Sequence, residues 1–224
     1  MKYYVFISKS SPKVESGEGL GSRYDLRGAC KNCGTGAELQ GALHAKGLND
    51  IKDDLFYTLD GDLLISKSLY SVFLDKGVVL NQVAEVYENG VGQRPFYHVN
   101  PKISLPKRSE QSHGLKVENQ CVVCKQDGFF NDVVMGSLEK GIPTYVKPIA
   151  LHYENMDEGL LRQSDIFHSW EHMGISNLRI EGNKVVRYAR PLLIVSNRFK
   201  RVVESHKIKK ISFNEVIIHP HEIE

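Results

Sequence analysis

The sequence has no long apolar run, a single tryptophan, four cysteines and almost no excess of charge of either sign. No segment approaches the roughly 18 consecutive apolar residues of a membrane-spanning helix, so we expect no membrane span. Lys and Arg total 29 against 27 Asp and Glu, and this net charge of +2 argues against a polybasic protein that binds nucleic acid or membranes by charge alone. A hydrophobic content of 41% is too high for a disordered chain. An ordinary globular protein remains.

The N-terminus lacks the features of a signal peptide. The apolar run from Tyr3 to Ile7 ends at Ser8, whereas a secretory signal needs roughly 7–15 apolar residues and a cleavage site. Such a run is typical of a first β-strand. We therefore expect a cytoplasmic protein, in which cysteines serve more often as metal ligands or redox groups than as structural disulfides.

The length of 224 residues allows one large domain or two small ones. The pattern predicts an α+β fold of mixed short strands with three to four helices, in a single domain of residues 1–224. A polar segment from Asn100 to Asn119 suggests subdomains 1–100 and 120–224, bridged by a shared metal site. A short helix is expected at Asp165–Gly174, capped by Ser164.

One pattern occurs twice, at a constant offset of 130 positions. Leu63–Ser66 and Leu193–Ser196 each read as a buried strand that ends in a serine cap, and each precedes an amphipathic helix. Return strands are expected at Val83–Val86 and Phe213–Val216. These two strand–Ser–helix–strand modules are either a duplication or a chance match of a common unit, and the sequence leaves both interpretations open.

All four cysteines fall in two Cys-x-x-Cys pairs, Cys30–Cys33 and Cys121–Cys124. Zn²⁺ prefers four tetrahedral ligands, and one such pair can occupy an edge of the tetrahedron from a single tight turn. Gly34 suits a turn that needs a positive φ. The 87 residues between Cys33 and Cys121 (34–120) exceed the spacing of a compact zinc ribbon. The spacing therefore predicts a structural zinc site that joins two distant parts of the chain.

Other uses of the cysteines remain open. They could form two separate dithiols or act as small buried hydrophobes. A dithiol oxidoreductase would need a pair at a helix N-terminus with an accessible thiol of low pKa, and neither pair is followed by a helical pattern. His44 and His113, the histidines nearest to each pair in sequence, are reserve ligands.

No catalytic signature accompanies the cysteines. The sequence contains no His-Glu-x-x-His, Gly-x-Ser-x-Gly, Walker loop or Gly-x-Gly-x-x-Gly motif. His168 and His172 would share a face of the expected helix, which we interpret as a partly exposed amphipathic helix rather than half of a metal site. We expect a protein that is not an enzyme.

The cysteine pairs and the C-terminal module together resemble a bacterial family. The segment Cys30–Gly34, the second pair at Cys121–Cys124 and the run Leu193–Lys200 resemble the double-CXXCG motif proteins, and Leu193–Glu204 also resembles the helix entry of immunity domains. The resemblance implies a small cytosolic protein that neutralises a cognate toxin of a polymorphic toxin system. The second motif departs from the family because Lys125 follows Cys124 in place of glycine, and a non-glycine residue is disfavoured at positive φ.

The resemblance predicts a bacterial immunity protein that binds a cognate toxin and neutralises it sterically. If that toxin is a cationic nuclease, an acidic segment would face it: Asp50, Asp53, Asp54, Asp60 and Asp62. The alternatives are a dithiol oxidoreductase and a zinc-ribbon nucleic-acid-binding protein. The nucleic-acid binder would use a basic cluster: Arg198, Lys200, Arg201, Lys207, Lys209 and Lys210. The near-neutral net charge argues against strong phosphate binding.

Overall fold

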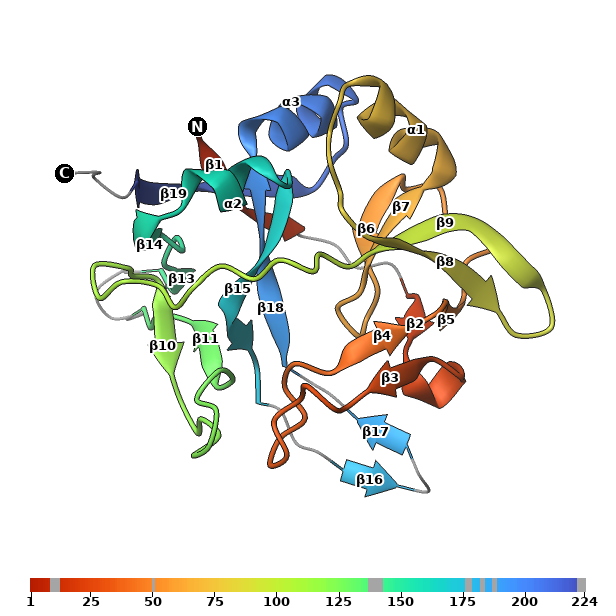
Figure 1. Ribbon diagram of the computed structural model, residues 1–224, viewed down its shortest axis with the longest axis horizontal. Helices are drawn as coiled ribbons and strands as arrows, with labels where there is room; N and C mark the ends of the chain where they lie inside the picture. Colours follow the sequence, from red (N-terminus) through yellow and green to blue (C-terminus); the bar gives the residue numbers. More distant parts are fainter. Residues whose placement is uncertain are drawn as a thin grey trace.

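The computed structural model describes residues 1–8, 13–49, 51–136, 143–175, 179–181, 184–186 and 189–220. The expected mixture of helix and strand is confirmed, but strands predominate and helices are fewer than expected. Two large sheets lie side by side, and two helices, α1 and α3, lie next to each other at one end (Figure 1). Within the described residues, no helix has the length and apolar character needed to cross a membrane.

The elements group as follows. The first sheet has the order β2-β5-β8-β9-β7-β6, with strands β2 (Glu15–Ser16), β5 (Leu43–Lys46), β6 (Leu55–Tyr57), β7 (Leu63–Ser66), β8 (Val83–Glu88) and β9 (Gly92–Val99). The second has the order β14-β19-β1-β18-β15, with strands β1 (Tyr3–Ser8), β14 (Leu151–Met156), β15 (Ile166–Met173), β18 (Arg190–Ser196) and β19 (Ile211–Pro220). The helices are α1 (Lys67–Asp75), α2 (Glu158–Arg162), α3 (Asn197–Ser205) and a 3₁₀ turn, η1 (Glu18–Leu20).

Four two-stranded hairpins complete the described part of the fold. They are β3 (Arg23–Asp25) with β4 (Glu38–Gln40), β10 (Leu115–Val117) with β11 (Phe129–Asn131), β12 (Val133–Val134) with β13 (Tyr145–Val146), and β16 (Arg179–Glu181) with β17 (Lys184–Val186). The first two of these hairpins carry the cysteines.

Both predicted strand–Ser–helix–strand modules are confirmed. The Oγ of Ser66 accepts a hydrogen bond from the backbone N–H of Leu69 at 3.1 Å, and β8 returns after α1. The Oγ of Ser196 accepts one from Phe199 at 3.2 Å, and β19 returns after α3. Each serine therefore satisfies an N–H of the first turn, which has no partner within the helix.

The similarity extends beyond the modules to the neighbouring strands. In the first sheet β7 pairs antiparallel with β6 and β9, while β8 pairs antiparallel with β9 and parallel with β5. In the second sheet β18 pairs in the same way with β15 and β1, and β19 pairs with β1 and β14. The registers also agree, because Ser66 lies opposite Phe96 and Ser196 lies opposite Tyr3. We call residues 13–99 the first repeat and residues 104–220 together with 1–8 the second repeat.

The two repeats differ in how the chain supplies the central strand. In the first repeat β9 follows β8 through a short turn, closed by a hydrogen bond from Val91 N–H to Glu88 O at 3.0 Å. In the second repeat the same place is taken by β1, the first strand of the chain, which lies between β18 and β19. The N-terminus consequently lies on the same side of the molecule as the end of β19 (Figure 1).

The hydrophobic core consists of one cluster shared by the two repeats and one further cluster in each repeat. A central cluster contains residues from both repeats, and within it the rings of Phe73 in α1 and Phe199 in α3 stack at 4.8 Å. Each repeat also has an apolar cluster of its own, around Phe56 in the first and Phe167 in the second. The repeats are therefore joined by a continuous hydrophobic interface as well as by the loops described below.

The helix expected at Asp165–Gly174 is wrong, because Ile166–Met173 form strand β15. Its burial alternates: Phe167, Ser169 and Glu171 are buried, and the residues between them are half-buried. Two of the three buried positions are polar, so the sequence conceals a period of two. His168 and His172 therefore lie on a strand, and β18 pairs with both of them.

Candidate metal centre

The first cysteine pair lies at the tip of hairpin β3–β4. The carbonyl of Cys30 accepts a hydrogen bond from Gly34 N–H at 2.7 Å, and Cys30 N–H donates to Thr35 O at 2.8 Å. These bonds turn the chain back on itself, so that Cys30 and Cys33 present their sulfurs to the same side. Gly34 has a φ of 76°, as its place after the pair predicts.

The second pair forms a matching turn at the tip of hairpin β10–β11. The carbonyl of Cys121 accepts a hydrogen bond from Lys125 N–H at 3.0 Å, the same contact that Cys30 makes with Gly34. Lys125 takes a φ of 55° although it is not glycine. The departure from the motif thus leaves the turn intact, at the cost of a left-handed lysine. We call the two turns, residues 30–36 and 121–127, the knuckles.

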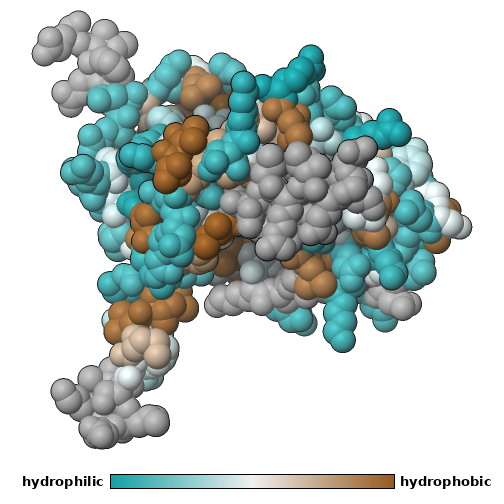
Figure 2. Space-filling model, turned by 90° about the horizontal axis from the view of Figure 1, so that it is seen from below, coloured by the Kyte–Doolittle hydropathy of each residue, from teal (hydrophilic) through white to brown (hydrophobic). Residues whose placement is uncertain are grey.

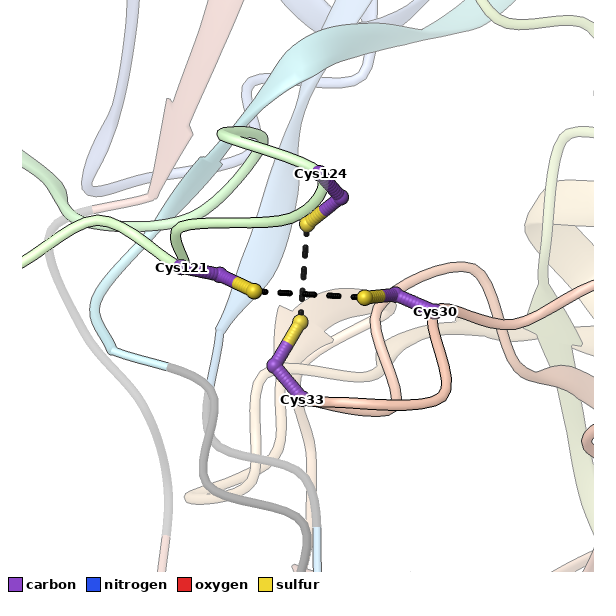
Figure 3. A group of neighbouring side chains, drawn as sticks. All are labelled: Cys30, Cys33, Cys121 and Cys124. Carbon is purple, nitrogen blue, oxygen red and sulfur yellow. Dashed lines mark hydrogen bonds between the residues drawn. The ribbon is translucent and has the colours of Figure 1, made fainter.

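The two knuckles bring all four sulfurs together (Figure 3). The Sγ atoms of Cys30, Cys33, Cys121 and Cys124 all lie within 4.8 Å of one another. The distance is 3.9 Å between Cys30 and Cys121 and 3.5 Å between Cys33 and Cys124. A tetrahedral site with metal–sulfur bonds of ~2.3 Å has sulfur–sulfur edges of about 3.8 Å, whereas a disulfide needs ~2.05 Å. The four thiols are free and suit a metal ion.

Burial and hydrogen bonds make the thiols unequal. Burial raises the pKa of Cys33 and of Cys124. Burial also raises the pKa of Cys121, but hydrogen bonds from the backbone of Cys124 and from Asn32 outweigh it and bring the pKa to about 6. Asn32 Nδ2 lies 3.2 Å from the Cys121 sulfur. Cys121 is thus more easily converted than Cys33 or Cys124 to the thiolate that a metal requires.

Neither reserve histidine joins the cysteines. The described residues contain one group of metal-ligating side chains, and it consists of the four cysteines alone. His44 lies in β5, where its backbone N–H donates to Ser22 Oγ at 2.8 Å. The ring of His113 lies 6.3 Å from that of His152. The ligand set predicted from the sequence is therefore the one that the fold assembles.

The acidic segment does not form one exposed patch. Asp53 and Asp54 are exposed, but Asp54 accepts a hydrogen bond from Ser66 Oγ at 2.6 Å. Asp60 is exposed and accepts one from a backbone N–H. Asp62 is only 6% exposed and so offers almost no surface to a partner. Asp50 lies outside the described residues.

A cavity of about 660 Å³ lies between the repeats and reaches Cys30 and Cys124. Buried polar groups line it: Nε2 of His98 is 3.5 Å from Oδ1 of Asp62, and Nε of Arg190 is 4.0 Å from the same oxygen. No sequence motif marks this site, because its residues come from separate strands and follow no local spacing. We call it the junction cavity.

No known protein family matches the chain, and none of the curated proteins matches it. The resemblance to the double-CXXCG proteins consequently rests on the short motifs themselves.

Proposed function

We propose that the chain is a bacterial immunity protein that holds one structural Zn²⁺ at its four cysteines and neutralises a cognate toxin by covering part of its surface. The observation that carries the proposal is the convergence of both Cys-x-x-Cys motifs, on which the family resemblance rests, at one centre. Four thiolates favour zinc over the hard cations that prefer oxygen, and they leave no coordination position for a substrate. The metal then has a structural role.

The geometry favours this function over both alternatives. The knuckles are hairpin tips, whereas a dithiol oxidoreductase places its pair at a helix N-terminus. Two members of the basic cluster already contact other side chains of the protein. Arg198 lies 2.8 Å from a carboxylate oxygen of Asp165, and Lys200 lies over the ring of Tyr4 at 4.1 Å. Fewer cations remain for phosphate contacts than the sequence suggests.

We place the contact with the toxin at the second knuckle. Val122 and Val123 lie between the two cysteines and are 81% and 67% exposed. Other apolar side chains are exposed as well, among them Met135, Tyr145 and Val146 at the β12–β13 hairpin, and Figure 2 shows several apolar patches among hydrophilic side chains on the side toward which the knuckle hairpins extend. Exposed apolar residues on a rigid turn are suited to anchor a protein interface. Zinc would supply that rigidity.

Two measurements test the proposal separately. Metal analysis should find about one zinc per chain, and the variant Cys121→Ser should lose it. A metal-free protein with four titratable thiols would refute the centre.

Co-expression with a toxin encoded beside the gene should restore growth. The double variant Val122→Asp with Val123→Asp should abolish rescue. Val91→Asp, which changes a valine that is 55% exposed in the turn between β8 and β9, should not. A zinc-loaded protein that rescues from no neighbouring toxin would refute immunity alone.

A further inference from the structure

We propose that the junction cavity binds an uncharged planar heteroaromatic molecule of the nucleobase or nucleoside class. The cavity adjoins the proposed toxin contact, because Val123 lies in its wall, but the inference does not rest on that contact. The volume of about 660 Å³ lies within the range of small-molecule sites in proteins, roughly 300–1,000 Å³. Both repeats contribute to the wall, so the site exists only in the complete chain.

The charges in the wall favour an uncharged ligand. Apart from the metal centre and the histidines, the buried or half-buried charges are those of Asp62 and Arg190, which lie 4.0 Å apart, so each offsets the other. His168 stays neutral at pH 7, because burial lowers its pKa to about 3. Lys102 and Glu38 also line the cavity, but both are exposed and opposite in sign. A phosphate or carboxylate would thus be buried without a counter-charge, which costs several kcal/mol.

Three amide side chains in the wall of the same cavity offer further hydrogen-bonding groups. The side chains of Gln82, Asn100 and Gln126 line the cavity and are half-buried. None of these three amides has a side-chain hydrogen bond to the part of the chain that the structure describes. An amide presents a donor and an acceptor side by side, and this pair matches the edge of a nucleobase.

Flat side chains supply the remaining element of such a site. Tyr57, Trp170 and the histidines His98, His168 and His172 line the cavity. Stacking of a base on an aromatic ring contributes ~1–3 kcal/mol and suits any planar heterocycle. Aromatic faces with amide edges therefore favour a base over an anionic metabolite.

The sole tryptophan of the chain, Trp170, reports on the site directly. We would titrate the zinc-loaded full chain with adenosine, guanosine, cytidine and uridine and follow its fluorescence. We expect a saturable change with at least one nucleoside. Gln82→Leu and Asn100→Leu should each weaken that binding at least tenfold, whereas Gln93→Leu, on the exposed side of β9, should leave it unchanged.

Calorimetry with Gln126→Leu provides a second measurement if the first variants do not fold. Tenfold weaker nucleoside binding by this variant supports the site. The absence of saturable binding by all four nucleosides would overturn the proposal, and so would binding of ribose 5-phosphate or glucose in their place. Nucleoside binding that all three leucine variants retain would also overturn it, because the ligand would then lie elsewhere.

Discussion

At the scale of single residues, the two knuckles differ in the free energy that their left-handed residue costs, because the second has Lys125 where the first has Gly34. A left-handed conformation costs a non-glycine residue ~1–2 kcal/mol, and Lys125 has a φ of 55°. Glycine relieves that cost but loses ~0.5–1 kcal/mol through greater freedom in the unfolded chain. Lys125→Gly should therefore stabilise the zinc-loaded protein by up to about 1 kcal/mol in chemical denaturation.

The matched control for this substitution is Lys125→Ala. Alanine keeps the Cβ atom, and with it the backbone cost, while it removes the same charge. We expect no gain in stability from this variant. An equal gain from alanine would show that the charge, and not the left-handed backbone, limits the second knuckle.

The buried carboxyl of Glu171 leads to a second prediction, on how the stability of the protein depends on pH. Its side chain is fully buried, one carboxylate oxygen accepts from Arg108 N–H at 2.9 Å, and Oε2 has no partner among the described residues. Burial raises the pKa of this carboxyl above 4.5. A carboxyl with a higher pKa in the folded state binds its proton more tightly there, so stability falls as the pH rises through that pKa.

Glu171→Gln removes this titration. The free energy of unfolding of the variant should increase relative to the wild type as the pH rises above about 4.5, measured by denaturation at each pH. Glu154→Gln, which replaces an exposed carboxyl on β14, serves as the control and should show no such trend. A constant difference for Glu171→Gln would contradict the burial effect.

At the scale of elements, the two capping serines allow a comparison within one chain. Loss of a serine cap costs ~1 kcal/mol. The Oγ of each serine also donates to an aspartate. Half-buried Ser66 donates to the exposed Asp54. Buried Ser196 donates instead to the buried Asp165. Asp165 in turn accepts from Val79 N–H at 2.8 Å and so links the second repeat to the first.

Ser196→Ala should therefore destabilise the protein more than Ser66→Ala does. The first change removes a cap and leaves a buried carboxylate with fewer donors, which adds to the cost. Thermal denaturation of the two variants beside the wild type measures the difference. Equal losses would show that the link through Asp165 contributes nothing beyond the cap.

At the scale of the whole molecule, the presence of two similar repeats predicts that the protein tolerates a circular permutation, in which the second repeat precedes the first in the chain. A circular permutant that joins Glu224 to Met1 through a short linker and opens after Lys102 keeps every pair of strands and both knuckles. It should fold and bind one metal ion, as followed by circular dichroism and metal analysis. A permutant opened within β9 would break a central strand and should not fold. If the first permutant fails as well, continuity between the repeats is essential.

The sequence predicts a structural feature when the residues that form it lie close together in the chain. The cysteine turns and serine caps are local, and both are where the sequence places them. The sequence pattern predicts a helix where the chain forms strand β15, because Ser169 and Glu171 occupy buried positions that usually carry apolar residues. The junction cavity could not be predicted, since His98 and Arg190 meet only through the packing of two sheets. The place of β1 also depends on partners at the opposite end of the chain.

The position of β1 has a consequence for biosynthesis. This strand is translated well before both of its neighbours, β18 and β19. The first repeat can pair its strands as soon as β9 has emerged, whereas β1 must wait for β18 and β19 before the second sheet can form. During that interval β1 is an unpaired apolar segment, and the emergence of β18 and β19 is the event that lets the second sheet close around it.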